Sequence, residues 1–161
     1  MTPLAIAGLV AQIKEDAIDS RVWKSWALSE LEKSTSGSTW LPDLVDANGP
    51  DEALAALWKA WRIESLDDLE VDPTSLRLGF MYLAHLSGRL TLAEILRRAG
   101  ERADRANYDH PACEAFYLLL NEMDGKGSTR PSAEPLDARA AMLFEPHLAR
   151  ARAASNALRA G

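Results

Sequence analysis

The chain has 161 residues, 47% of them apolar and 26% charged, with a formal net charge of −6 and a pI of about 5.1. This length and composition suit one globular domain and exclude a largely disordered chain. The negative charge argues against non-specific nucleic-acid binding and against an anionic membrane surface, because both attract cationic proteins. We therefore expect a single domain over residues 1–161 with neither of these partners.

Residues 3–15 are predicted to form the first helix, because their apolar side chains recur at intervals of three and four. This apolar stretch is too short to span a bilayer and lacks the preceding positive charges of a signal peptide. The single cysteine, Cys113, cannot form an internal disulfide. Together these features predict a cytoplasmic protein.

The next predicted helices cover residues 20–33 and 50–63, with Ser20 as the N-cap of the first. Between them, residues 34–39 have the composition of a short connector, and residues 42–48 suit a single helical turn.

The pattern within residues 50–63 is the clearest in the chain. Pro50 fits the first helical position. An apolar stripe of helical period is then predicted to be buried: Leu54, Leu57, Trp58 and Trp61.

Residues 76–87 follow Pro73 and are apolar on nearly every side, which predicts a central helix that Gly88 ends. Thr91 and Glu94 have the spacing of a capping box and predict a helix that continues to about residue 105.

A further helix is predicted over residues 111–124, followed by a flexible loop at about 125–135. Residues 136–160 are helical by pattern, but Pro146 is expected to kink or interrupt this helix. Alternating strand patterns are lacking, and alanine, leucine and arginine are abundant. The prediction is an all-α fold: a compact irregular bundle of about seven helices around residues 76–87.

Two segments resemble one another: residues 22–31 and 57–66 are identical at four of ten positions, including a Trp-x-x-Trp motif. Their offset is close to the period of helical-hairpin repeats. No third copy follows at the same interval, so the sequence leaves open whether the similarity is a repeat.

Potential metal ligands are concentrated in one region: Asp104, Asp109, His110, Cys113 and Glu114. Zinc sites normally use several histidines or cysteines, and this group has one of each. Cys113 also fits the apolar stripe of its helix, where a buried thiol is common.

Carboxylate pairs that suit a Mg²⁺-dependent hydrolase occur at Glu64 with Asp67 and at Glu101 with Asp104. The second pair is interleaved with arginines, as on a solvated helix face. We predict no catalytic residue, no metal site and no cofactor.

The excess negative charge is concentrated in residues 35–75, which hold nine acidic residues against two basic ones. Such a segment steers and binds a basic partner, and Trp40 at its edge is predicted to be an exposed interface anchor. The predicted partner-binding residues are Trp40, Asp43, Asp46, Asp51, Glu52, Asp67, Asp68, Glu70 and Asp72.

The leading hypothesis is therefore a non-catalytic protein-binding domain. Its most concrete form is a bacterial immunity or antitoxin protein that masks a basic toxin or another cationic protein. The alternatives are a helical-hairpin scaffold or adaptor and a small helical metal-dependent hydrolase. Whether the chain forms a homo-oligomer is left open.

Overall fold

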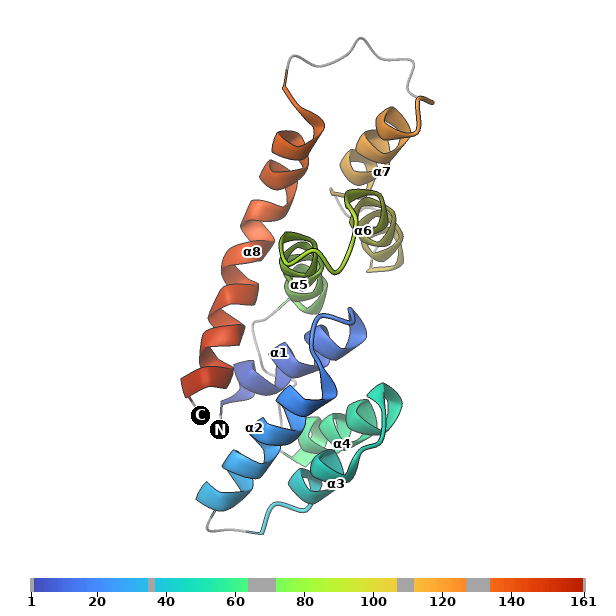
Figure 1. Ribbon diagram of the computed structural model, residues 1–161. Helices are drawn as coiled ribbons and strands as arrows, with labels where there is room; N and C mark the ends of the chain where they lie inside the picture. Colours follow the sequence, from blue (N-terminus) through green and yellow to red (C-terminus); the bar gives the residue numbers. More distant parts are fainter. Residues whose placement is uncertain (1, 35–36, 64–71, 107–111, 127–133, 161) are drawn as a thin grey trace. The chain divides into compact units, whose positions relative to one another are not determined.

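The computed structural model describes residues 2–34, 37–63, 72–106, 112–126 and 134–160 (Figure 1). All regular structure in these residues is α-helical, which confirms the predicted fold class. The helices are α1 (Pro3–Lys14), α2 (Ser20–Lys33), α3 (Trp40–Asp46), α4 (Pro50–Ile63), α5 (Pro73–Leu86), α6 (Leu92–Ala106), α7 (Ala112–Met123) and α8 (Leu136–Ala160).

The structure has one helix more than the seven predicted, because residues expected to form a single helical turn belong to the seven-residue helix α3. This helix begins at Trp40, two positions before the predicted turn. The predicted flexible loop falls mainly at residues 127–133, and the predicted connector includes residues 35–36; both of these stretches lie outside the described residues.

The chain divides into two compact units. The first unit contains residues 1–73 and 151–161, and the second contains residues 74–150. Helix α8 therefore contributes residues to both. The single domain expected from the sequence stays a prediction, because compactness of the parts does not decide whether they unfold together.

Helix α1 is the most enclosed element of the first unit, because nine consecutive residues from Ala5 to Ile13 are buried. A Cβ atom added at Gly8 would lie 3.0 Å from the Cβ of Ala154, in the last turns of α8. A small residue is therefore needed where these two helices meet.

Three tryptophans also belong to this core. Trp23, Trp26 and Trp40 are all buried, and the rings of Trp26 and Trp40 lie 6.3 Å apart between centroids. The indole nitrogens of all three are buried without a hydrogen-bond partner in the described structure. Ring volume, not hydrogen bonding, therefore explains why tryptophan occupies these positions.

The second unit has a different aromatic core. The Phe144 ring stacks on Tyr82 with 5.0 Å between centroids and packs against Phe116 at 4.9 Å. Ser75 is 1% exposed, and its Oγ atom lies 2.7 Å from the Nδ1 atom of His147. Because a buried hydroxyl requires a partner, this pair links α5 to α8 within the unit.

Helix α5 contains eight buried residues, so the predicted apolar helix exists. It belongs to the second unit, and α1 is the corresponding enclosed helix of the first.

Local sequence signals set several helix ends. The Thr91 N–H donates to Glu94 Oε2 (2.8 Å), and the Glu94 N–H donates to Thr91 Oγ1 (3.3 Å), which confirms the capping box. The bond from the Thr91 N–H holds the pKa of Glu94 below its ordinary value. Gly88 has a φ of 75°, and the Arg89 N–H donates to the Ala84 carbonyl, so a glycine-based C-cap ends α5 as predicted.

One prediction about a helix end was wrong. The N-cap of α2 is Asp19, whose Oδ1 accepts from the Arg21 N–H at 2.9 Å, not Ser20. Helix α8 spans Leu136–Ala160 with Pro146 inside it, so of the two predicted effects of this proline the interruption is not observed. The carbonyl that Pro146 leaves without its helical bond belongs to Met142, a residue that is 64% exposed.

No helix in the described part of the chain is long and apolar enough to cross a membrane.

Candidate functional site

The predicted interface anchor Trp40 is fully buried, with an exposed fraction of 0%, so the prediction of an exposed tryptophan is wrong. Trp40, Leu41 and Leu44 form the buried face of α3, and Trp40 packs against Trp26 of α2. The physical reason is the length of α3. A seven-residue helix has few apolar side chains with which to attach to its neighbours, and a large aromatic ring supplies most of that area.

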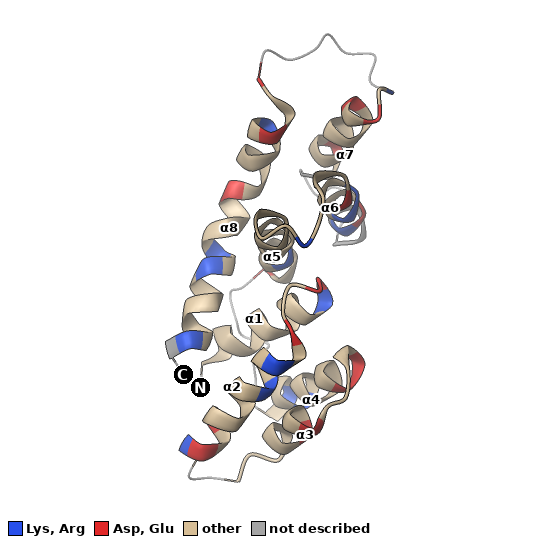
Figure 2. Cartoon of the chain, in the orientation of Figure 1, with Lys and Arg blue, Asp and Glu red and all other residues tan. Residues whose placement is uncertain are grey.

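The carboxylates of the same region do reach the surface. Asp43 and Asp46 lie on the exposed side of α3, and Asp51 and Glu52 lie in the first turn of α4. Figure 2 shows the acidic positions on both helices. We call these four residues the acidic α3–α4 surface.

The remaining predicted residues are less informative. Asp72 is exposed and directly precedes α5, and it has an interaction partner of its own. Asp67, Asp68 and Glu70 lie outside the described residues. The structure therefore brings together four of the predicted acids.

A hollow of about 510 Å³ lies between α3 and α4. Three of its lining residues are acidic, and Lys59 is the one basic residue among them. The lining is completed by a neutral amide and three alanines: Asn48, Ala47, Ala55 and Ala56. The lining of the hollow thus contains both alanine methyl groups and carboxylates.

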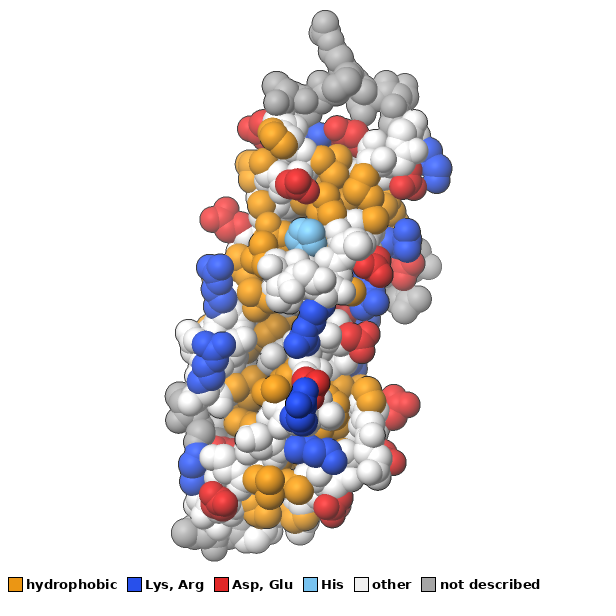
Figure 3. Space-filling view, in the orientation of Figure 1, with side chains coloured by type: hydrophobic (Ala, Val, Ile, Leu, Met, Phe, Trp, Pro, Cys, Tyr) orange, Lys and Arg blue, Asp and Glu red, His pale blue; other side chains and the backbone are white. Residues whose placement is uncertain are grey.

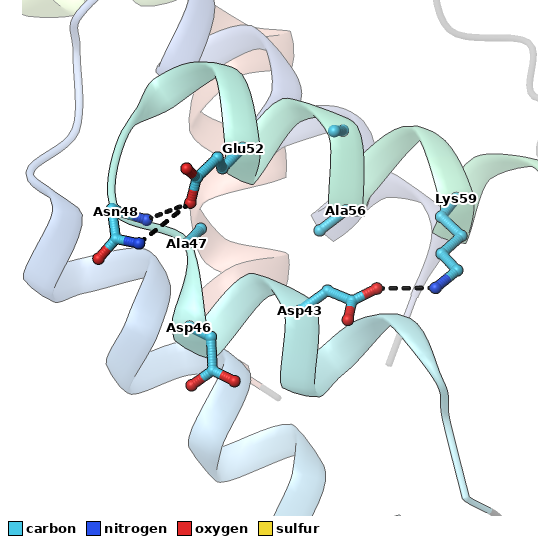
Figure 4. A pocket seen from close by; sticks show the side chains of 8 residues that line it. Asp43, Asp46, Ala47, Asn48, Glu52, Ala56 and Lys59 are labelled. Carbon is cyan, nitrogen blue, oxygen red and sulfur yellow. Dashed lines mark hydrogen bonds and ion pairs between the residues drawn. The ribbon is translucent and has the colours of Figure 1, made fainter.

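Two of the three carboxylates already have partners inside the hollow (Figure 4). Asp43 Oδ2 lies 2.7 Å from Lys59 Nζ, and both side chains are about half exposed. Glu52 Oε2 accepts from the Asn48 backbone N–H at 2.8 Å and from its side-chain amide at 3.3 Å. These bonds join the two helices and fix the turn between them.

Asp46 and Asp51 form no ion pair with the residues that the structure describes. Their charges add to that of Glu52, which is bonded only to neutral donors. The acidic α3–α4 surface therefore keeps a net negative charge after its internal ion pair is counted.

Sequence reasoning missed the tryptophan that is exposed. Trp58 of α4 was predicted to be buried, but it is 41% exposed. The Nζ atom of Lys14 lies over its ring, 5.0 Å from the ring centroid. The buried stripe of α4 consists instead of Ala53, Ala56, Leu57 and Ala60. The alanines at spacings of three and four were the signal, because small side chains let helices approach closely.

The two Trp-x-x-Trp segments have different environments. Trp23 is 3% exposed and its counterpart Trp58 is 41% exposed. Trp26 is buried, whereas its counterpart Trp61 is half-buried and packs against Trp58 at 5.8 Å between ring centroids. Equivalent positions, which a structural repeat requires, are not observed for these pairs.

The potential metal ligands are only partly described. Asp109 and His110 lie outside the described residues, as do the side chain of Asp104 and the pair Glu64 and Asp67. Cys113 is half-buried and its Sγ lies 3.5 Å from the Gly100 carbonyl oxygen, while Glu114 and Glu101 are exposed. Within the described residues, no group of three or more His, Cys, Asp or Glu side chains converges.

Comparisons of the chain with protein-family models, with curated proteins and with solved structures found no match.

Proposed function

We propose that this chain is a non-catalytic protein-binding domain whose acidic α3–α4 surface binds a basic protein. Its most concrete form is an immunity or antitoxin protein of a bacterium that masks the cationic cleft of a toxin. The observation that carries the proposal is that Asp43, Asp46 and Glu52 line one hollow together with a single basic residue.

The chemistry of the hollow suits a lysine or arginine side chain of the partner. The methyl groups of the alanines would contact the aliphatic stem, and the surrounding carboxylates would receive the cationic end. Asp43 is bonded to Lys59, so Asp46, Glu52 and the neighbouring Asp51 supply the unneutralised charge.

Long-range attraction is the second expected contribution. Residues 35–75 hold nine acidic and two basic residues, whereas the whole sequence has a net charge of −6. Such a concentration of net charge raises the association rate of an oppositely charged protein. Because salt screens this attraction beyond about 10 Å at 0.1 M ionic strength, the association rate should fall as salt rises.

The test uses the full chain and the basic proteins encoded by the genes that adjoin its own. Association is measured by surface plasmon resonance at low and high salt. We expect a complex whose association rate falls with salt and whose affinity falls about tenfold or more in the variant Asp46→Lys/Asp51→Lys. These two acids are chosen because no described ion pair or helix cap depends on them.

The matched control is Glu114→Lys/Asp137→Lys, which changes the net charge by the same amount at exposed positions of the second unit. This variant should bind like the unmodified chain. Equal loss in both variants would show an effect of net charge alone, and the absence of any complex at low salt would remove the proposed function.

A further inference from the structure

A second surface of the first unit is lined by apolar and basic side chains, with no acidic residue among them. Two hollows lie between α2 and the C-terminal turns of α8, and they share the lining residues Val22, Trp26, Leu158 and Arg159. They therefore form one continuous depression, which we call the α2–α8 groove. Figure 3 looks onto this part of the molecule and shows hydrophobic side chains with basic side chains on either side.

The floor of the groove follows one stripe of α2. Val22, Ser25, Trp26, Ser29 and Lys33 line it, and their spacing of three and four places them on one helix face. From Val22 to Lys33 this stripe is about 16 Å long, at a rise of about 1.5 Å per residue. Val22 is 53% exposed although its side chain is apolar.

One end of the groove is deeper. A hollow of about 170 Å³ continues beneath Val22 and is lined by further apolar side chains, including Leu9 of α1 and Ile18. Its size suits one apolar side chain of a partner, whereas the rest of the groove stays open along α2.

All charged residues that line the groove are basic: Arg21, Lys33 and Arg159. Arg21 is held by Asp19 (Nε to Oδ1, 3.2 Å) and Lys33 by Glu30 (Nζ to Oε1, 3.4 Å). Arg159 forms no ion pair with the described residues. Once these two ion pairs are counted, the net positive charge of the groove edge comes from Arg159.

We propose that the α2–α8 groove binds an amphipathic helix with an acidic polar face, supplied by another protein. The apolar face of such a helix would cover Val22 and Leu158 and place one side chain in the deep end, while its carboxylates would meet the three basic residues. The open form of the groove favours a helix over a small molecule, because small-molecule sites enclose most of their ligand. This site is independent of the acidic α3–α4 surface and would let the domain bind two partners of opposite charge.

The test uses two synthetic peptides of about 12 residues, which as helices span about 18 Å at about 1.5 Å per residue and so cover the stripe of about 16 Å on α2. Both carry leucines at spacings of three and four, and the remaining positions are mainly glutamate in one peptide and mainly lysine in the other. Binding of each labelled peptide to the full chain is followed by fluorescence anisotropy at low salt.

We expect the glutamate peptide to bind and its affinity to fall about tenfold in Lys33→Glu/Arg159→Glu. Both residues are exposed, but Lys33 pairs with the buried Glu30, so folding of this variant is checked by circular dichroism. Arg159→Glu alone, which breaks no ion pair among the described residues, should weaken binding in the same direction. Ser29→Trp, which fills the groove without a change of charge, should weaken binding as well. The control Arg97→Glu/Arg150→Glu, at exposed positions of the second unit, should bind like the unmodified chain.

The variant Asp46→Lys/Asp51→Lys should retain the glutamate peptide, which separates this inference from the proposed function. The inference is overturned if the glutamate peptide does not bind, or if its affinity is unchanged in Lys33→Glu/Arg159→Glu. It is also overturned if sedimentation shows that the chain self-associates through the groove, since the occupant would then be a second copy of this chain.

Discussion

The two units use different aromatic residues to fill their cores. All five tryptophans belong to the first unit, and all three phenylalanines, tyrosines and histidines belong to the second. In the first unit, three buried indole N–H groups have no hydrogen-bond partner in the described structure. In the second, the buried Ser75 hydroxyl is matched by His147, and phenyl rings without polar atoms pack together.

This difference has an energetic consequence. A buried donor without an acceptor lowers the free energy of unfolding by about 1–3 kcal/mol. In the first unit, the burial of the large indole rings must therefore outweigh the cost of burying their N–H groups. The second unit gains ring contacts without that cost. We therefore expect the first unit to depend on ring volume and the second unit on ring contacts and one polar pair.

The largest expected effect is that of Trp40→Ala. Removal of this fully buried ring should lower the free energy of unfolding by an amount near the upper end of about 3–5 kcal/mol. Trp58→Ala, which removes the same side chain from a half-exposed site, should cost less than about 1 kcal/mol. Urea unfolding of both variants tests the burial of the two rings, and similar losses would contradict it.

Phe116→Ala should cost an amount near the lower end of about 3–5 kcal/mol, because Phe116 is buried in the second unit against Phe144. Its unfolding can be followed in two ways, since tryptophan fluorescence reports on the first unit alone and far-UV circular dichroism reports on both. If the chain is a single cooperative domain, both signals should shift to the same lower midpoint. A fluorescence midpoint that does not move would show that the units unfold separately.

Ser75→Ala should destabilise the chain by about 1–3 kcal/mol, because it removes the partner of a ring nitrogen of His147. Ser87→Ala is the matched control, since the exposed Ser87 hydroxyl bonds only the Ala84 carbonyl within its own turn. The control should stay within about 0.5 kcal/mol of the unmodified chain. Equal stability of both variants would mean that the polar pair contributes nothing to the second unit.

The smallest expected effects concern the N-terminus of α6. Thr91→Ala should cost about 1 kcal/mol through loss of the cap. Because the folded-state pKa of Glu94 is lowered, its contribution is fully present above the unfolded-state pKa and is lost as the pH falls through the folded-state pKa. The stability difference between the unmodified chain and Glu94→Ala should therefore shrink on acidification, and a difference that stays constant would contradict the assigned bond.

Much of the secondary structure could be predicted because its signals are local. The capping box at Thr91 and Glu94, the glycine at position 88 and the prolines at positions 50 and 73 act on backbone groups within one or two turns. The predicted bounds for 20–33 and 50–63 agree with α2 and α4 for the same reason. Three acidic residues of α3 and α4 line one hollow because only a short turn separates the two helices.

The burial of each tryptophan was decided by the tertiary structure. Trp23 and Trp58 each begin a Trp-Lys-x-Trp motif, yet one is buried and the other is exposed. A helical period states which residues share a face, but neighbouring helices determine which face is covered, and the alanines of α4 allowed a close contact on the side away from Trp58. The α2–α8 groove likewise joins residues more than a hundred positions apart, a proximity that no local pattern encodes.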